Sequence, residues 1–453
     1  MGDALKRWLT QAVDSAADWQ AQWEAVPQYP ALMVSEERFQ AVFAEFAERM
    51  RDNYPFFHPA YAGQMLKPPH PAAIASYVAA MLVNPNNHAL DGGPATASME
   101  KEAVAWLAAM FGFQGHLGHL TSSGTIANLE ALFVAREIHP DRGIAVSEEG
   151  HYTHERVCHL LGLDCHKVAT DTMGRMDLEA LATALDRGGV GTVVLTAGTT
   201  ALGAIDPIPE ALQLARTRGV RVHVDAAYGG FFTTLAGDLL PAEPWRAIAD
   251  CDSVVVDPHK HGLQPFGCGA VVFRDPAVGR FFKHDSPYTY FTSGDLHLGE
   301  ISLECSRAGA AAAAVWVTLR LFPLSPDGLG AVLAPGLRAA RRWADLLASS
   351  EHLDLYQQPE LDIVTFFPRP PGARTSEVDV AAQRLFELGM NPAEPAYLSV
   401  LRVTGEALGR RHPALVADAD PVRILRSVLM KPEAEAYLDR LHGRVERLAA
   451  EAV

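Results

Sequence analysis

Short apolar runs rich in β-branched residues alternate with helical patterns between residues 117 and 273, and this alternation limits the possible folds more than any other feature of the chain. Strands are expected at 192–196, 220–224 and 253–256, and the first and last of these runs lack polar alternation, which is typical of strands covered on both faces. Strands that alternate with helices predict a mostly parallel sheet in an α/β domain. Ligands bind such sheets beyond the carboxyl ends of the strands, so the residues there are the first functional candidates.

The rest of the chain predicts two smaller units beside this sheet. The first 70 residues predict helices that are rich in Trp, Phe and Glu and are broken at prolines. A break with several Pro and Gly residues follows Leu324, and the chain beyond it mixes helices with short strands at 363–367 and 423–430. The predicted units are an N-terminal helical segment (1–70), a large domain (71–325) and a small C-terminal α+β domain (326–453). Within the large domain we also expect strands at 144–147 and 270–273 and helices at 126–136, 152–161 and 209–217.

Composition argues against several classes of partner. The chain has 453 residues and a formal net charge of −16, whereas nucleic acids and anionic membranes require a basic face. Its five cysteines form no CxxC motif, so we expect neither a disulfide framework nor a zinc ribbon, and we expect a cytoplasmic location. The apolar stretch 308–319 is shorter than the ~20 residues that a membrane helix needs, and the N-terminus lacks the apolar core of a signal peptide.

The strongest functional signal is a lysine directly after a predicted strand, in Val254-Val255-Val256-Asp257-Pro258-His259-Lys260. This position lies at the ligand edge of the sheet. A lysine there can lose its proton and form a Schiff base with an aldehyde. The alternative interpretation is a solvated loop lysine.

A second strand ends on a carboxylate, Asp225, which is followed by Ala226 and Ala227. An aspartate at this position can pair with a protonated pyridine nitrogen, the partner that pyridoxal phosphate requires. The small alanines allow a flat ring to approach the backbone. The alternative is an Asp that caps a helix.

Two further segments lie at strand ends. Ser123, Gly124 and Thr125 stand between a strand and a helix, where hydroxyls and free N–H groups can bind an anion, although a plain helix cap fits equally well. His151 follows the strand at 144–147, and its imidazole could lie flat on an aromatic ring; a surface histidine is the alternative.

Together these segments resemble the group II pyridoxal-phosphate decarboxylases, which include aromatic-amino-acid, glutamate and archaeal tyrosine/aspartate decarboxylases. The resemblance runs from about Phe57 to the C-terminus, and the lysine motif is most similar to that of the archaeal branch. It implies the aspartate-aminotransferase-like fold (fold type I). The stretches that carry it are NPNNHALDGGPATASMEKEAV, TSSGTIANLEAL, AGTTALGAIDPI, HVDAAYGGF and DPHKHGLQPFGCG.

The resemblance implies a role for each of these positions. Lys260 carries pyridoxal phosphate as a Schiff base, Asp225 pairs with the pyridine nitrogen, and His151 and Ala227 lie against the two faces of the ring. Arg426 meets the substrate carboxylate. The family also implies a homodimer with active sites at the subunit interface. The further cofactor-binding residues are Ser123, Gly124 and Thr125 at the phosphate, with His259 and Asp257, and Thr199 or Thr200 near the cofactor or the substrate.

The proton donor to the substrate carbon stays open. Many relatives place a tyrosine on a loop upstream of an arginine like Arg307, but His297 stands near that position here. Tyr288 and Tyr290 lie slightly earlier, so these three residues are the candidates. His261 is a second departure, because many relatives have an aromatic residue or Met after the lysine.

Several readings compete for the function as a whole. The favoured one is decarboxylation of an L-amino acid; the alternatives are a carbon–carbon lyase similar to the sphingosine-phosphate lyases and a non-catalytic protein of the same fold. We favour an aromatic substrate, for which Phe56, Phe57 and Tyr61 could form a pocket, over an acidic one, which Arg307 or Arg402 could bind. We expect no metal site, because in His154-Glu155 followed by His159 the second histidine comes one residue too late.

Overall fold

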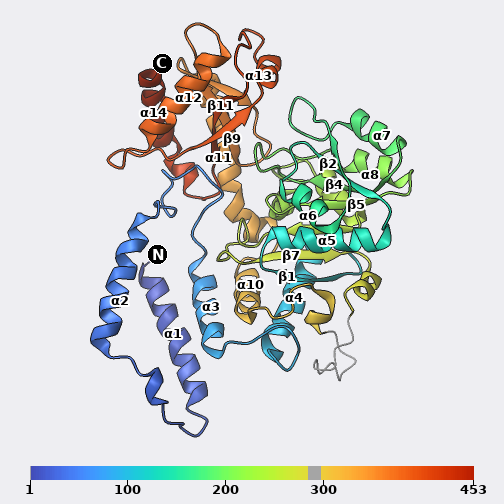
Figure 1. Cartoon of the computed structure of the whole chain (residues 1–453). Helices are drawn as coiled ribbons and strands as arrows, with labels where there is room; N and C mark the ends of the chain where they lie inside the picture. The colour runs from blue at the N-terminus through green and yellow to red at the C-terminus, as the bar shows by residue number, and fades with distance from the viewer. Residues whose placement is uncertain (1, 284–296) are drawn as a thin grey trace.

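A seven-stranded sheet forms the centre of the computed structural model, which describes residues 2–283 and 297–453 (Figure 1). The strand order is β1-β7-β6-β5-β4-β2-β3, and only β7 runs opposite to the other six strands. The strands are β1 (Leu117–Thr121), β2 (Gly143–Ser147), β3 (Cys165–Val168), β4 (Val190–Thr196), β5 (Arg221–Asp225), β6 (Ser253–Val256) and β7 (Gly269–Phe273).

Helices cover both faces of this sheet, which is why strands such as β6 and β7 are almost entirely apolar and buried along their whole length. Successive residues of a strand point to opposite faces. Val255 and Val271 therefore pack in the cluster that contains α5, whereas Val254, Val256 and Val272 pack in the cluster that contains α4 and α8. The helices of this part are α4 (Pro94–Met110), α5 (Gly124–Ile138), α6 (Thr153–Leu161), α7 (Leu178–Asp186), α8 (Ile208–Arg216), α9 (Glu243–Ala247) and α10 (Gly309–Leu321).

The C-terminal part is a four-stranded antiparallel sheet, ordered β10-β11-β9-β8, with helices packed against it. Its core contains Trp343 of α11 and Phe366 of β9, whose ring centroids are 5.2 Å apart. The strands are β8 (Leu353–Gln357), β9 (Ile363–Pro368), β10 (Ser399–Val403) and β11 (Val422–Val428), and the helices are α11 (Ala331–Ala348), α12 (Thr375–Gly389), α13 (Gly405–Arg411) and α14 (Ala434–Ala452).

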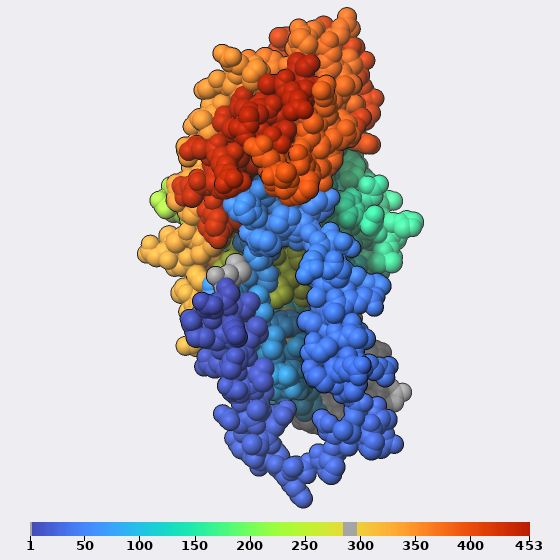
Figure 2. All heavy atoms as spheres, turned by 90° about the vertical axis from the view of Figure 1, so that its left-hand side faces the viewer, coloured from blue at the N-terminus to red at the C-terminus, as the bar shows by residue number. Residues whose placement is uncertain are grey.

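Three N-terminal helices extend from the body: α1 (Gly2–Gln20), α2 (Glu36–Arg49) and α3 (Pro71–Val83). Helix α1 packs on α3, and α3 packs on α10. Helix α2 contains no buried residue. Figure 2 shows α1 and α2 as two separate columns on one side of the molecule.

The expected fold class is confirmed: a mostly parallel α/β sheet with an N-terminal helical segment and a smaller C-terminal α+β part. Four of the six neighbouring strand pairs are parallel. The domain boundaries at 70 and 325 stay a prediction. Within the described ranges, no helix is long and apolar enough to cross a membrane.

Candidate active site

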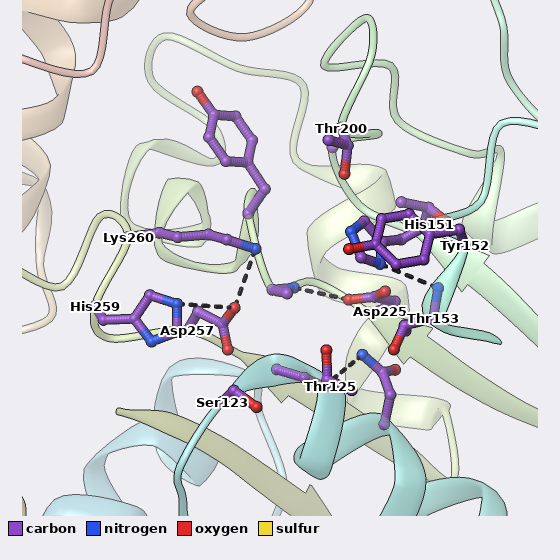
Figure 3. Close-up of a pocket in the computed structure, with 16 residues that line it drawn as sticks. Ser123, Thr125, His151, Tyr152, Thr153, Thr200, Asp225, Asp257, His259 and Lys260 are labelled. Atoms are coloured by element: carbon purple, nitrogen blue, oxygen red, sulfur yellow. Dashed lines mark hydrogen bonds and ion pairs between the residues drawn. The ribbon is translucent and has the colours of Figure 1, made fainter. Parts of the chain in front are cut away.

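A cavity of about 250 Å³ lies beyond the carboxyl ends of β2, β4, β5 and β6, the edge at which the sequence placed the site (Figure 3). These strands run in parallel, so the loops that follow them meet at one edge. The lining residues are Ser123, Gly124, Thr125, Asn128, His151, Tyr152, Thr153, Thr196, Gly198, Thr200, Asp225, Ala227, Tyr228, Asp257, His259 and Lys260.

The N-terminus of α5 opens onto this cavity. Ser123 caps the helix, because its Oγ accepts a hydrogen bond from the N–H of Ile126 (3.3 Å). Gly124 follows without a side chain, and a Cβ there would lie 2.6 Å from Oδ2 of Asp257. The first N–H groups of a helix have no partner within it and attract anions. The turn Ser123–Thr125 can therefore hold a phosphate group.

Asp225, the last residue of β5, is buried and carries negative charge. Its Oδ1 accepts from the N–H of Ala227 (3.1 Å), and its Oδ2 lies 2.8 Å from Nε2 of His154. A carboxylate only accepts, so Nε2–H of His154 donates. Burial alone raises the pKa of Asp225, but the hydrogen bond from His154 and the nearby charges of His154 and Lys260 outweigh burial and hold this pKa well below its usual range.

Lys260 reaches the same cavity from the turn after β6. Its Nζ lies 3.0 Å from Oδ2 of Asp257. The same oxygen is 3.5 Å from Nε2 of His259, whose Nδ1 accepts from the N–H of Cys268 (3.3 Å). Burial lowers the pKa of His259, so its ring is a neutral donor at Nε2. Asp257 thus holds the lysine amine and the His259 ring at one carboxylate.

His151 lies on the opposite wall, in the loop after β2. Its Nδ1 accepts from the N–H of Thr153 (3.2 Å), and its ring centroid is 4.2 Å from that of Tyr152, which also lines the cavity. Burial lowers the pKa of His151, which favours the neutral imidazole. Figure 3 shows His151 and Asp225 facing the same space.

The loop after β4 places its two threonines differently. Thr200 lines the cavity, whereas Thr199 is fully buried and its Oγ1 accepts from the N–H of Ala204 (3.1 Å). Arg426 of β11 lies behind this loop. Its Nη2 donates to the carbonyl of Thr200 (2.6 Å), its Nε to that of Ala201 (3.1 Å), and its Nη1 to that of Gly63 (3.2 Å).

The three candidates for the proton donor lie away from this cavity or outside the described ranges. His297 is buried, and its Nδ1 accepts from the N–H of Leu90 (3.3 Å). It does not line the cavity. Tyr288 and Tyr290 lie outside the residues that the structure describes.

These groups fit pyridoxal phosphate. The helix N-terminus suits its phosphate, the anionic Asp225 suits a protonated pyridine nitrogen, and Lys260 suits its aldehyde. Oδ1 of Asp257 is also buried without a hydrogen-bond partner in the described ranges, next to the cradle that Gly124 leaves open. The sites for phosphate, ring nitrogen and aldehyde thus surround one cavity.

Comparison with known proteins decides the family. Residues 37–368 match the family described as the pyridoxal-dependent decarboxylase conserved domain. The chain belongs to this family. It is 30% identical to the L-aspartate decarboxylase of Thermococcus kodakarensis over 75% of this chain and 86% of that protein. It is 27% identical to the L-tyrosine decarboxylase of Enterococcus faecium over 76% of this chain and 75% of that protein.

Solved structures show the same fold. Mouse CSAD superposes with a TM-score of 0.80 at 22% identity, covering 99% of this chain and 98% of that chain. The TDC of Oryza sativa, solved with PLP and tryptamine, has a TM-score of 0.79 at 18% identity, covering 100% and 98%. The protein is thus a pyridoxal-phosphate-dependent amino-acid decarboxylase, which confirms the favoured reading over the lyase and the non-catalytic alternatives.

Sequence reasoning missed several residues of this site. Asn128, Tyr152 and Tyr228 line the cavity, and His154 binds Asp225. A partial signal for His154 was present, because it lies at the start of the helix that follows His151, on the same edge of the sheet. Its proximity to Asp225, 71 residues later, could not be read from that spacing.

Proposed function

We propose that this decarboxylase acts on an L-amino acid with an uncharged aromatic side chain. The observation that carries the proposal is the lining of the cavity: among the described residues, Lys260 is its only Lys or Arg, and the cofactor requires that lysine. A substrate with a side-chain carboxylate would need a second cation, because a buried unpaired carboxylate is strongly disfavoured. The rings of Tyr152 and Tyr228 line the cavity instead.

The arginines considered for an acidic substrate do not line the cavity. Nη1 of Arg307 lies 3.0 Å from Oε1 of Glu100 and also donates to the carbonyl of Leu120. Arg402 is exposed on β10. Arg426 binds backbone carbonyls, so it holds the loop that carries Thr200. The proposed contact between Arg426 and the α-carboxylate of the substrate would require some of these bonds to open.

The sequence of residues 284–296, which lie outside the described ranges, is also aromatic rather than basic. It contains Tyr288, Tyr290 and Phe291 but no Lys or Arg. Phe56, Phe57 and Tyr61 do not line the cavity of their own chain. Relatives of both substrate classes are similar to the chain, so the lining and not the identity supports the aromatic choice.

Each residue of the site then has a task. Bound pyridoxal phosphate supplies a cationic ring that accepts the electron pair left behind when the α-carboxylate departs as carbon dioxide. Asp225 keeps the proton on the ring nitrogen, and His154 keeps Asp225 ionised. Lys260 would hold the cofactor at its aldehyde and would supply the amine that exchanges with the amines of substrate and product. Ser123, Gly124 and Thr125 fix the phosphate.

The decisive experiment measures carbon dioxide release by the cofactor-loaded protein across the common L-amino acids, with Lys260→Ala as the control. We expect release from tyrosine, tryptophan or phenylalanine, with loss of at least about 1000-fold in the control because nucleophilic catalysis is removed. Release from aspartate or glutamate alone would overturn the aromatic assignment. An aldehyde product without carbon dioxide would overturn the reaction class.

We propose further that the proton donor to the substrate carbon is one of Tyr288, Tyr290 and His297. Single Tyr288→Phe, Tyr290→Phe and His297→Gln variants test this, because each removes the donor and keeps the approximate shape. General acid catalysis contributes about 100- to 10,000-fold, so one variant should lose turnover in that range. Three variants with wild-type turnover would exclude all three residues.

We also propose a homodimer whose active sites lie at the subunit interface. Phe39, Phe43 and Phe46 of α2 form one apolar face, with neighbouring ring centroids 5.5 and 5.6 Å apart. Their exposed fractions are 51%, 49% and 52%. Half-exposed aromatic rings in a row indicate a covered surface in the assembled protein. Family resemblance supports a second copy of this chain as the cover.

The cytoplasm is the proposed location. All five cysteines lie in the described ranges and none forms a disulfide there, as expected in a reducing compartment. The proposal predicts that the expressed protein fractionates with cytoplasmic enzymes. Recovery in an oxidising compartment would contradict it.

A further inference from the structure

A buried carboxylate of the C-terminal part, called the small domain below, connects the loop that follows Asp225 with the turn that carries Lys260. Asp362 lies just before β9 and is 1% exposed. Its Oδ1 accepts a hydrogen bond from the hydroxyl of Tyr228, and its Oδ2 lies 2.9 Å from Nε2 of His261. Tyr228 comes three residues after Asp225, and His261 comes directly after Lys260.

The hydrogen-bond partners fix where the protons lie. Nδ1 of His261 is 3.0 Å from the carbonyl oxygen of Tyr228, which can only accept, so this nitrogen carries a proton. Burial and the adjacent charge of Asp362 raise the pKa of Tyr228 far above its usual value, so its hydroxyl stays a donor. Burial alone raises the pKa of Asp362, but the charge of His261 and the hydrogen bonds from His261 and Tyr228 outweigh burial and lower it. The carboxylate is therefore ionised and bound on both oxygens.

The carboxylate of Asp362 connects the segments after β5 and β6 at a point where backbone hydrogen bonds no longer join them. The pairing of β5 with β6 continues through Ala226 N–H to the carbonyl of Val255 (3.0 Å) and ends with Asp257 N–H to that of Ala227 (3.2 Å). Beyond that point, the His261 ring bonds to the carbonyl oxygen of Tyr228, and Asp362 bonds to the side chains of both residues. Tyr228 and His261 therefore link the edge of the seven-stranded sheet to the small domain through Asp362.

The turn that holds Lys260 and His261 is tightly packed. A Cβ on Gly262 would lie 2.6 Å from Cα of Pro258, so the backbone folds tightly on itself. Leu263 has φ = +65°, a left-handed conformation that the surroundings must hold in a residue with a side chain. A turn packed this closely leaves little room for the backbone at His261 to shift independently of Lys260.

We propose that Asp362 is a positioning residue for the decarboxylation: through Tyr228 and His261 it sets the placement of Asp225 and Lys260 relative to each other and to the small domain. The proposal rests on pyridoxal phosphate binding between Asp225 and Lys260, and it holds whichever amino acid is the substrate. His261, the departure from the family pattern after the lysine, is then the residue that lets the small domain reach the cofactor anchor.

Three variants of the cofactor-loaded enzyme test this. Asp362→Ala removes both acceptors, whereas Asp362→Asn keeps the shape and can still bind the Tyr228 hydroxyl and a neutral His261. Tyr228→Phe removes a single hydroxyl and keeps the ring, so it folds even where Asp362→Ala does not. Asp379→Ala is the matched control, because Asp379 pairs with Arg423 inside the small domain (2.9 Å) and touches neither loop.

The readouts are kcat, KM and the visible circular dichroism of the bound cofactor, which reports its placement without substrate. We expect Asp362→Ala to lower kcat by about 10- to 100-fold, the loss typical of misplaced reacting groups, with KM changed less than kcat and the dichroism altered. Asp362→Asn should keep most of the wild-type kcat and dichroism, and Asp379→Ala should change neither kcat nor the dichroism.

A double variant provides the second criterion. Tyr228→Phe and His261→Gln should be non-additive when combined, because both act through Asp362. Independent, additive losses would overturn the proposal. A folded, cofactor-saturated Asp362→Ala enzyme with unchanged kcat and dichroism would also overturn it. If Asp362→Ala fails to fold, unchanged dichroism in Tyr228→Phe would overturn it instead.

Discussion

The residue that keeps Asp225 ionised is His154, and its removal should weaken the hold on the cofactor. In His154→Phe the ring shape stays, but the donor to Oδ2 and its charge are lost, so the pKa of Asp225 rises. A partly neutral Asp225 holds the ring proton less well. We expect about a 10-fold loss in cofactor affinity and turnover, comparable to the loss of other outer hydrogen-bond partners.

Titration of the apoprotein with pyridoxal phosphate, followed by visible absorbance, measures the affinity. His159→Phe is the control, because His159 is exposed on the same helix α6. Equal affinities of His154→Phe and the wild type would refute the role. The same change in the control would show that the aromatic substitution itself is responsible.

Residues at strand ends could be predicted because the backbone alone puts them there. Lys260, Asp225, His151 and the turn at Ser123 all follow runs whose apolar composition marks a strand. Side-chain contacts between distant segments left no such trace. His154 meets Asp225 across 71 residues and Tyr228 meets Asp362 across 134, and nothing local in either segment reports the other.

At the scale of elements, strand β5 carries a buried histidine that should make stability depend on pH. His223 donates from Nε2 to Oδ1 of Asn128 (2.9 Å) and accepts at Nδ1 from the hydroxyl of Ser253 (2.8 Å), so the neutral ring is satisfied. Burial lowers the pKa of His223 to about 3 from 6.5. The unfolded chain therefore takes up a proton below pH 6.5 that the folded chain cannot. The stabilisation is complete above 6.5 and is lost as pH falls toward 3.

Urea unfolding between pH 7 and pH 5 checks this. As the pH is lowered below 6, the free energy of unfolding of the wild type should fall by about 1.4 kcal/mol more per pH unit than that of His223→Gln. His159→Gln, exposed in the folded state, should leave the slope unchanged. Parallel curves for the wild type and His223→Gln would contradict the prediction.

The central strands and helices were predictable within a few residues because their apolar patterns report burial. The apolar pattern alone did not give the direction of β7, although the spacing along the chain did. Val271 and Val272 read as a strand buried on both faces, which is true whether it runs parallel or antiparallel. The spacing from β6 to β7 leaves room only for the Lys260 turn and no crossover helix, and a parallel neighbour needs such a crossover.

At the scale of the whole molecule, the face of α2 predicts the oligomeric state. The aromatic spacing was visible in the sequence, but whether the body of the same chain covered it was not. Since the structure leaves these rings half exposed, each that becomes buried between subunits contributes on the order of 1–2 kcal/mol. Light scattering should therefore give twice the chain mass of 49.0 kDa at micromolar concentration. A monomer with full activity would contradict both the dimer and the interfacial site.

Charged substitutions on that face locate the interface. Phe43→Glu places a carboxylate at the centre of the aromatic row, where a dimer would bury it, so we expect a shift toward monomer and a parallel loss of decarboxylation. Val380→Glu introduces the same charge at an exposed apolar residue of α12, remote from α2, and should change neither. A dimer that survives Phe43→Glu would show that the copies meet elsewhere. A monomeric Phe43→Glu variant with full activity would show that each subunit completes its own site.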